Sequence, residues 1–593
     1  MRWLVATFVL GACGRIAFDP IDQPVPSAPM CTAAGWCWEN PLPQGEPIRW
    51  LSGTSANDIW AACGNGQVMH YDGTSWSFGL AMDSRQSLSG IWAQAPDNVW
   101  AVTDYIGHGL THFDGTSWTP SDLPQSHAGS GLMSGNAIYG IAPDDIWVVG
   151  FGGDAAHYDG SAWTQFTVTS STDLYGVWFE SNNDVFVSGD SGTMYRFNGT
   201  TWTRFQPTTN GVNQSAWGTA PNDVWTGGYS NKLWHFDGTS WLPSTVATTN
   251  FYSFTGGWSA SHDDVWAATW EGGLFRGNFT TGFTDYGWGE TLYGFWGASA
   301  DDIWVGGDGG RLHHWNGVEW LPYFQFGPLT ILNAIDGTSP SNLWVVGGGG
   351  TILRRDTTGH WKPFDSPSTT SNFNDVKAFA ANDVWIAGYG VVFHWDGTTW
   401  TKAVDEPMTT FLHIDGTASN DLWAITDRLN VEQVRHYDGT SWNVVDTGAT
   451  GYFGGIWVRG LGDVWLSRDA NILHLEAGTW VQRYTQPYSN TTRFTGTSND
   501  DVWAMGPQSI NHWDGTSWTE YAAPLLRGRE YLNGLSMLAP DDIWFVADFA
   551  MYHWDGLDVT KVSPRPTSNR LKDVIGFGSE MWSVGSSGTI LHR

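Results

Sequence analysis

The stretch His70-Tyr71-Asp72-Gly73-Thr74-Ser75-Trp76 (HYDGTSW, 70–76) decides the fold, because close copies of it recur along the chain. The same seven letters return at 436–442, HFDGTSW stands at 112–118 and at 235–241, and HWDGTSW stands at 512–518. Asp-Gly between apolar stretches is a strong hairpin signal, because glycine accepts the positive φ that tight primed turns require. We therefore interpret the phrase as a joint between two β-strands.

A second phrase, Asp-(Ile/Val)-Trp, divides the 593 residues into fourteen units of about 40 residues, the period of a four-stranded propeller blade. Each unit has an apolar first strand, a second strand such as 146–149, a third strand ending in His-aromatic-Asp, and an outer strand that begins at Trp. The second strands are apolar on both faces, as expected for sheets packed between neighbours. We predict an all-β chain of fourteen four-stranded blades with almost no helix. The units are anchored at Trp60, Trp100, Trp147, Phe186, Trp225, Trp266, Trp304, Trp344, Trp385, Trp423, Trp465, Trp503, Trp544 and Trp582.

The two ends of the chain indicate how the units close. The last unit stops at 589–593, after its third strand, while the N-terminal segment 35–43 resembles an outer strand such as 239–243. We predict that 36–43 completes the seventh unit and that the strand from Trp320 completes the fourteenth. This division gives two seven-bladed propellers, 36–316 and 317–593, each closed by a donated outer strand. The alternative is one fourteen-bladed ring, whose sheets, ~10 Å apart, would leave a wide central hole.

Two further positions recur with the anchors. The residue that opens the seven-residue phrase is His in eleven units and Arg in three, and the residue two before the anchor is Asp in eleven, Asn in two and Glu in one. These positions should face each other across the two middle strands. Copies on successive blades lie too far apart to share one ion, so we expect no metal, cofactor or catalytic residue among them. We predict structural donor–acceptor pairs, as in Asp58 with His70, Asp145 with His157, Asp223 with His235, and Asp302 with His314.

The first thirteen residues, MRWLVATFVLGAC, resemble a bacterial lipoprotein signal that ends in a lipobox at 10–13. The resemblance implies that Cys13 is lipidated and that 1–13 is the signal segment; an ordinary cleaved signal peptide is the alternative. The proline-rich stretch 14–35 is then expected to be a semi-rigid tether. We expect a bacterial envelope protein, anchored by lipid at the outer membrane or cell surface.

Export to the envelope permits disulfides. With Cys13 lipidated, one pair and one spare cysteine remain among Cys31, Cys37 and Cys63. Cys31 with Cys37 is the local pairing, and Cys37 with Cys63 is the alternative.

The balance of acidic and basic residues indicates which kinds of molecule the protein can bind. The formal net charge is −32, with 27 basic against 59 acidic residues, whereas a nucleic-acid binder needs a basic face. We therefore expect no nucleic-acid partner, membrane contact only through the lipid anchor, and a monomer.

Units such as DIWVGGDGGRLHHWNGVEW (302–320) resemble bacterial β-propeller repeats near the kelch and BNR/Asp-box modules. The glycine pair after the second strand and the late Asp and Trp carry the resemblance, which covers about 36–593. The chain departs from both patterns: its Asp-to-Trp spacing is one residue shorter than in an Asp-box, and most units lack the full kelch glycine pair. The resemblance implies a fold but no activity.

We expect a binding or scaffold module that recognises protein or glycan through variable loops on one propeller face. No nucleophile-elbow, P-loop or zinc-protease motif indicates an enzyme. The alternative is an envelope glycoside hydrolase or another polysaccharide-active enzyme, because carboxylates are abundant. The candidate ligand-loop residues are Arg527, Arg529, Arg565, Arg570, Trp270 and Trp288.

Overall fold

The computed structural model of the chain is made of antiparallel β-sheets. It describes residues 31–593 apart from 33, 41–43, 65, 82–87, 104–108, 130, 208–210, 230–231, 245, 247–251, 324–329, 369, 449, 486–490, 508, 522–530 and 564–565. Within the described residues the strands form 12 four-stranded sheets and one six-stranded sheet, and the helical elements are short 3-10 turns. The prediction of an all-β chain of four-stranded blades is confirmed. The 3-10 turns are η1 (Phe151–Gly153), η2 (Asp190–Gly192), η3 (Asp308–Gly310), η4 (Gly348–Gly350) and η5 (Ser586–Gly588).

The third unit shows how one sheet is built. Its strands β10 (Gly135–Ala142), β11 (Asp145–Gly150), β12 (Asp154–Tyr158) and β13 (Trp163–Thr167) pair in chain order. Every residue of β11 is buried, whereas β13 is only partly covered. The second strand is therefore apolar on both faces because neighbouring sheets cover it on both sides.

The seven-residue phrase forms a hairpin between the third and fourth strands of its unit, as predicted. In the first unit Tyr71 of β4 (Gln67–Tyr71) pairs with Trp76 of β5 (Trp76–Ala81), so 72–75 is a four-residue loop. The Asp72 carboxylate accepts hydrogen bonds from the backbone N–H groups of Thr74 and Ser75, both at 2.8 Å, and Gly73 has φ 88°. The aspartate side chain therefore supports a four-residue loop, which is wider than a tight two-residue primed turn.

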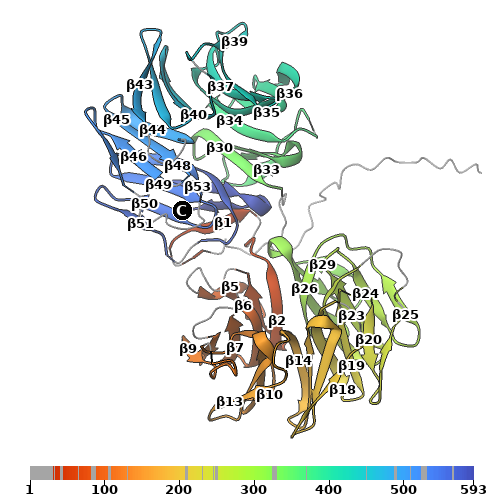
Figure 1. The fold of residues 1–593 in the computed structure, drawn as a ribbon. Helices are drawn as coiled ribbons and strands as arrows, with labels where there is room; N and C mark the ends of the chain where they lie inside the picture. Colours follow the sequence, from red (N-terminus) through yellow and green to blue (C-terminus); the bar gives the residue numbers. More distant parts are fainter. Residues whose placement is uncertain are drawn as a thin grey trace, which may run out of the picture.

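Contacts between the first strands order the units in space. In the first group, units one to seven, these strands are β2 (Ile48–Ser55), β6 (Leu88–Ala95), β10, β14 (Leu174–Ser181), β18 (Asn213–Ala220), β22 (Phe254–Ser261) and β26 (Leu292–Ser299). Each contacts the next, and β26 contacts β2. The second group, units eight to fourteen, starts at β30 (Leu332–Ser339) and returns to it through β52 (Leu571–Phe577). Each group of units thus returns to its starting strand, and the two groups are visible as two bodies in Figure 1.

The six-stranded sheet joins the ninth and tenth units. Its strands are β34 (Phe373–Ala380), β35 (Asp383–Trp395), β36 (Trp400–Ala418), β37 (Asp421–Arg428), β38 (Val431–Tyr437) and β39 (Trp442–Val445). The long strand β36 is the outer strand of the ninth unit at its start and the first strand of the tenth at its end. The pairings of Tyr389 with Thr410 and of Thr409 with Arg428 hold the two sheets together.

The predicted exchange of outer strands is wrong. The seventh unit keeps its own outer strand, β29 (Trp320–Pro322), which pairs with β28 (Leu312–Trp315) across a short hairpin loop. The N-terminal strand β1 (Cys37–Asn40) pairs instead with β54 (Ile590–His592), the third strand of the fourteenth unit. In Figure 1 the red β1 lies among the blue strands of the second group. The N-terminal strand therefore closes the last unit, and a tight hairpin keeps Trp320 in its own sheet.

The strand β1 is held by buried tryptophans and by a buried carboxylate. Trp36 and Trp38 are 0% exposed and pack with Trp544, Leu571 and other apolar side chains of the last two units. Glu39 accepts hydrogen bonds from the indoles of Trp361 and Trp582 at 2.7 and 3.0 Å, and it pairs with Arg355 and His592, each at 3.1 Å; the four partners lie in the eighth and fourteenth units. The strand thus links the first and last members of the second group.

The cysteines take the local pairing. Cys31 and Cys37 form a disulfide, and Cys63 is a buried free thiol in β3 (Asp58–Cys63). The alternative of Cys37 with Cys63 is wrong, because Cys37 stands in the strand that joins the fourteenth unit while Cys63 lies in the first.

Candidate functional site

The structure brings Asp and His together at the positions that the repeat singles out. In the first unit, His70 Nε2 lies 2.6 Å from Asp58 Oδ1, the Trp60 indole N–H donates to the same oxygen at 3.1 Å, and the Trp60 and His70 rings stack at 3.9 Å between centroids. The second and third strands are thus joined by an Asp–Trp–His group. The corresponding distances are 2.8 Å for Asp145 and His157, 2.8 Å for Asp223 and His235, and 2.7 Å for Asp302 and His314.

The units with arginine keep the same cross-strand arrangement. Arg196 donates through Nε and Nη2 to both oxygens of Asp184 at 2.5 and 2.8 Å, and Arg276 does the same to Asp264 at 2.7 and 2.9 Å. In the eighth unit Arg354 lies 4.7 Å above the Trp344 ring. Since the group recurs from unit to unit, its role is to hold the middle strands together.

Burial and hydrogen bonding compete in setting the pKa of these carboxyls. Burial raises the pKa of Asp58, but the hydrogen bonds from His70 and Thr54 outweigh it, so the net shift is downward. At Asp145 burial prevails over the bond from His157, and the pKa is raised. At Asp223 burial is again opposed, here by His235, Thr219 and His262, and the pKa falls to about 2.

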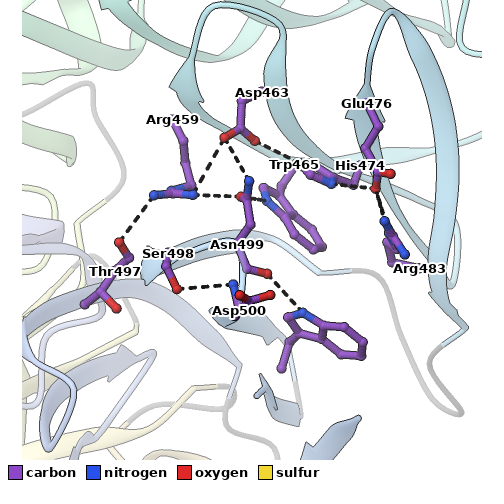
Figure 2. A network of polar contacts seen from close by, with 11 residues as sticks. Arg459, Asp463, Trp465, His474, Glu476, Arg483, Thr497, Ser498, Asn499 and Asp500 are labelled. Carbon is purple, nitrogen blue, oxygen red and sulfur yellow. Dashed lines mark hydrogen bonds and ion pairs between the residues drawn. The ribbon is translucent and has the colours of Figure 1, made fainter. Parts of the chain in front are cut away.

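In some units the residue four positions N-terminal to the anchor tryptophan contacts the preceding unit. In the eleventh unit Asp463 of β41 (Asp463–Arg468) pairs with His474 at 2.8 Å, and Asn499 of the twelfth unit donates to its other oxygen at 3.1 Å, as Figure 2 shows. Ser419 makes the corresponding contact with Asp383. This contact crosses from one unit to the next and was not predicted from the sequence.

The candidate ligand-loop residues are not brought together. Cys13, Arg527, Arg529 and Arg565 lie outside the described residues. Arg570 is exposed, with its guanidinium 5.6 Å from the Phe549 ring centre. Trp288 is half-buried against His313 and Trp320, with ring centroids 4.6 and 6.0 Å apart. Of this set, Trp270 alone belongs to a larger exposed aromatic group among the described residues.

That group, here called the aromatic row, runs along the edge where first strands begin and second strands end. Its members are Tyr175, Gln214, Tyr229, Trp270 and Tyr293, from the fourth to the seventh unit. Tyr229 and Trp270 follow the ends of β19 (Asp223–Gly228) and β23 (Asp264–Thr269), and they are 42% and 39% exposed. The other three are second residues of β14, β18 and β26.

Hydrogen bonds fix the rings of the row. The Gln214 amide nitrogen donates to the Tyr229 hydroxyl at 3.1 Å, and the Gln214 amide oxygen accepts from the Trp270 indole at 3.3 Å. Trp270 meets Tyr293 edge to face at 5.2 Å, and the Tyr293 hydroxyl donates to Asp308 at 2.6 Å. One glutamine therefore orients two exposed rings, and a third ring supports one of them from the side.

Acidic groups stand at both ends of the row. Burial, followed by the nearby charges of Asp190 and Asp173, raises the pKa of Tyr175 to about 12. Burial and the bond to Asp308 likewise raise the pKa of Tyr293. Both phenols thus stay protonated at neutral pH and remain hydrogen-bond donors.

The inner strands of the two groups differ in chemistry. In the first group the fifth residue of the first strand is aromatic in six units, as with Trp92, Trp178 and Trp217, and these indoles pack against the next unit. In the second group Lys377 pairs with Asp415 at 2.7 Å, and burial raises the pKa of Asp573 to about 7. The first strands of the first group therefore carry aromatic side chains at a position where some of those of the second group carry charged ones.

A hollow of about 400 Å³ lies between the eighth and ninth units, lined by Phe364, Trp395 and Trp400 among others. Trp395 and Trp400 are the two aromatics of the repeated phrase HWDGTTW. The hollow thus belongs to the repeated architecture of the rim, unlike the row, whose residues differ from unit to unit.

No protein-family model matches the chain, and no curated protein matches it. The chain is similar to PorZ, which is described as an essential bacterial surface component of the type-IX secretion system of Porphyromonas gingivalis. The two sequences are 11% identical, the match covers 94% of this chain and 86% of PorZ, and the TM-score is 0.59. It is also similar to the extracellular domain of the putative hybrid two component system BT3049 from B. thetaiotaomicron, with 11% identity over 92% of this chain and 81% of that chain and a TM-score of 0.38. YCF48 from Cyanidioschyzon merolae matches 45% of this chain over 96% of its own length, at 15% identity and a TM-score of 0.37.

At these identities the likeness concerns the fold alone. The fold likeness to PorZ agrees with the predicted all-β repeat architecture.

Proposed function

We propose that the chain is a binding module of the bacterial cell envelope that recognises a carbohydrate through the aromatic row. The observation that carries the proposal is the pair of exposed rings, Tyr229 and Trp270, both held by Gln214. An aromatic face packs well against the C–H face of a sugar, and its polar edge and neighbours bond the hydroxyls. Preorganised rings also lower the ordering cost of binding.

The polar groups around the row suit a neutral sugar. The Tyr175 and Tyr293 hydroxyls donate to Asp190 and Asp308 and so hold these carboxylates beside the row. The remaining oxygens of Asp190, Asp308 and Gln214 can accept hydrogen bonds from sugar hydroxyls. A binding surface with a few polar groups among aromatic rings gives orientation and specificity. The net charge of −32 disfavours polyanionic ligands in general.

The envelope location is part of the proposal. It is supported by the lipobox-like sequence at 10–13 and by the fold likeness to PorZ, a protein described as a bacterial surface component. The described residues include no helix with the length and hydropathy needed to span a bilayer. Attachment through a lipid on Cys13 is tested by metabolic labelling with a fatty-acid analogue, where wild type should be labelled and Cys13→Ala should not.

Screening on a glycan array followed by calorimetry with the best sugar tests the binding function. Trp270→Ala should weaken binding at least tenfold, which corresponds to about 1.4 kcal/mol. Tyr452 is 53% exposed in the second group, so Tyr452→Ala is the matched control and should bind as wild type does. Equal affinities for Trp270→Ala and wild type would contradict the proposal, and release of reducing ends from the bound polysaccharide would show a hydrolase instead.

A further inference from the structure

Three ligand-type side chains meet where the fifth and sixth units adjoin. Asp223 and His235 form the usual pair of the fifth unit, and His262 enters from the turn between β22 and β23 of the sixth. His235 Nε2 and His262 Nδ1 lie 2.8 and 3.0 Å from the same oxygen, Asp223 Oδ1. The ligand atoms of the three residues all lie within 4.8 Å of one another.

We propose that Asp223, His235 and His262 form a binding site for a divalent transition-metal ion, of which zinc is the type that two imidazoles and one carboxylate suit best. In a tetrahedral site with metal–ligand bonds near 2.0 to 2.1 Å, neighbouring ligand atoms stand about 3.3 Å apart. The distances of 2.8 and 3.0 Å from Asp223 Oδ1 to the two imidazole nitrogens need to lengthen by a few tenths of an ångström to admit the ion. The separation of the two nitrogens, which lie within 4.8 Å of each other, must settle at about the same 3.3 Å.

The hydrogen bonding of Asp223 favours this interpretation. Its Oδ1 faces three nitrogens, because the Trp225 indole also donates to it at 3.1 Å, while the Thr219 hydroxyl donates to Oδ2. A carboxylate oxygen has two lone pairs, so three donors exceed its capacity. An ion between the carboxylate and the two imidazoles replaces two of these donors, and the bonds from Trp225 and Thr219 then orient the ligand from outside.

Burial and exposure also fit a site with an open position. His235 is 3% exposed and lies between the rings of Trp225 and Phe279, at 4.5 and 5.2 Å between centroids. The His262 side chain is 52% exposed, so solvent reaches the site from its side. The site therefore offers three protein ligands and leaves room for water.

The side chain at position 262 differs from the amide side chains that join other neighbouring units at the corresponding position. His262 stands four residues before its anchor, where the fourth unit has Asn182 and the twelfth has Asn499. Asn499 donates to Asp463, and the amide nitrogen of Asn182 faces the Asp145 carboxylate. An amide joins the units but does not supply an imidazole ligand. Among the fourteen units this position is histidine once.

The corresponding residues of the other units suggest two matched variants. His262→Asn should keep the hydrogen bond between the units and remove the third ligand. Asn182→His should build the same cluster with Asp145 and His157, which already pair at 2.8 Å. Neither position belongs to the aromatic row, so failure of the metal site leaves the sugar-binding proposal untouched.

The experiment is titration of chelator-treated full chain with zinc chloride by calorimetry, with the metal content after dialysis measured by mass spectrometry. We expect one zinc per wild-type chain, none tightly held by His262→Asn, and a second in Asn182→His. Cobalt should give the visible absorption of a tetrahedral site in wild type and lose it in His262→Asn. Equal zinc stoichiometry and affinity in wild type and His262→Asn would overturn the proposal.

Discussion

Replacing Trp38 by alanine should loosen the second group of units and leave the first unchanged. Trp38 is 0% exposed in β1, whose partner strand β54 lies more than 550 residues away in sequence. A buried tryptophan covers 150–250 Å², which at ~25 cal/mol per Å² corresponds to about 4–6 kcal/mol. Alanine retains part of this burial, so we expect a loss of about 3–5 kcal/mol.

Hydrogen exchange followed by mass spectrometry locates the effect. A loss of 3–5 kcal/mol raises the population of the opened state by about two to four decades. Amides at 571–593 and at 352–363 should exchange faster by that factor, since β54 pairs with β1 and Glu39 bonds Arg355 and Trp361. Amides of β2 to β29 should exchange as in wild type.

The matched control is Trp241→Ala. Trp241 begins β21 (Trp241–Pro243) and pairs with Phe236 in the fifth unit, so its loss should affect the first group alone. Unchanged exchange at 571–593 in Trp38→Ala, or a rise of the same size in the first group, would refute the closing role of β1.

Three further predictions concern stability. The pKa of Glu39 in the folded state lies below its ordinary 4.5, so the stability that the charged carboxylate gives the fold is fully present above pH 4.5 and is lost as the pH falls through the folded pKa. Glu39→Gln should therefore lower the free energy of unfolding by about 1.5–3 kcal/mol at pH 7. In denaturant titrations this loss should become progressively smaller below pH 4.5. Asp302→Ala removes the acceptor for the Trp304 indole and His314, and its unfolding midpoint should drop by the equivalent of about 1–3 kcal/mol without change in sugar affinity; equal midpoints would contradict the pairing. Gly73→Ala places a Cβ 2.8 Å from that of Asn57 at φ 88° and should cost about 1–3 kcal/mol in thermal unfolding, whereas a neutral result would count against the loop geometry.

The repeated features of the fold could be predicted because each is dictated within one unit. The spacing of Asp302 and His314 around a glycine-rich turn places them on facing strands, and they lie 2.7 Å apart. The Asp-Gly signal located the hairpin at 72–75 but does not show that the Asp72 carboxylate accepts hydrogen bonds from two later N–H groups. Local patterns thus gave the hairpins, and side-chain hydrogen bonds set their length.

The partner of β1 was wrongly predicted. The sequence shows one unit without an outer strand, the fourteenth, but the prediction gave 36–43 to the seventh unit and moved the strand from Trp320 to the fourteenth. The choice is decided by Glu39, whose carboxylate meets Arg355 and the Trp361 and Trp582 indoles in the second group. These contacts join residues more than 300 positions apart, and a repeat pattern carries no information about them.

The candidate sites arise where units depart from the repeat. Every unit must bury its second strand and join its middle strands, so Trp225 and His235 are constrained as much as their counterparts elsewhere. Gln214 and His262 occupy positions that this architecture leaves free, which is why neighbouring units place unrelated residues there. Each makes a contact across a unit boundary, Gln214 with Trp270 and His262 with Asp223. In a closed array the boundaries between units are therefore where binding chemistry can differ without cost to the fold, and a sequence read one unit at a time passes over it.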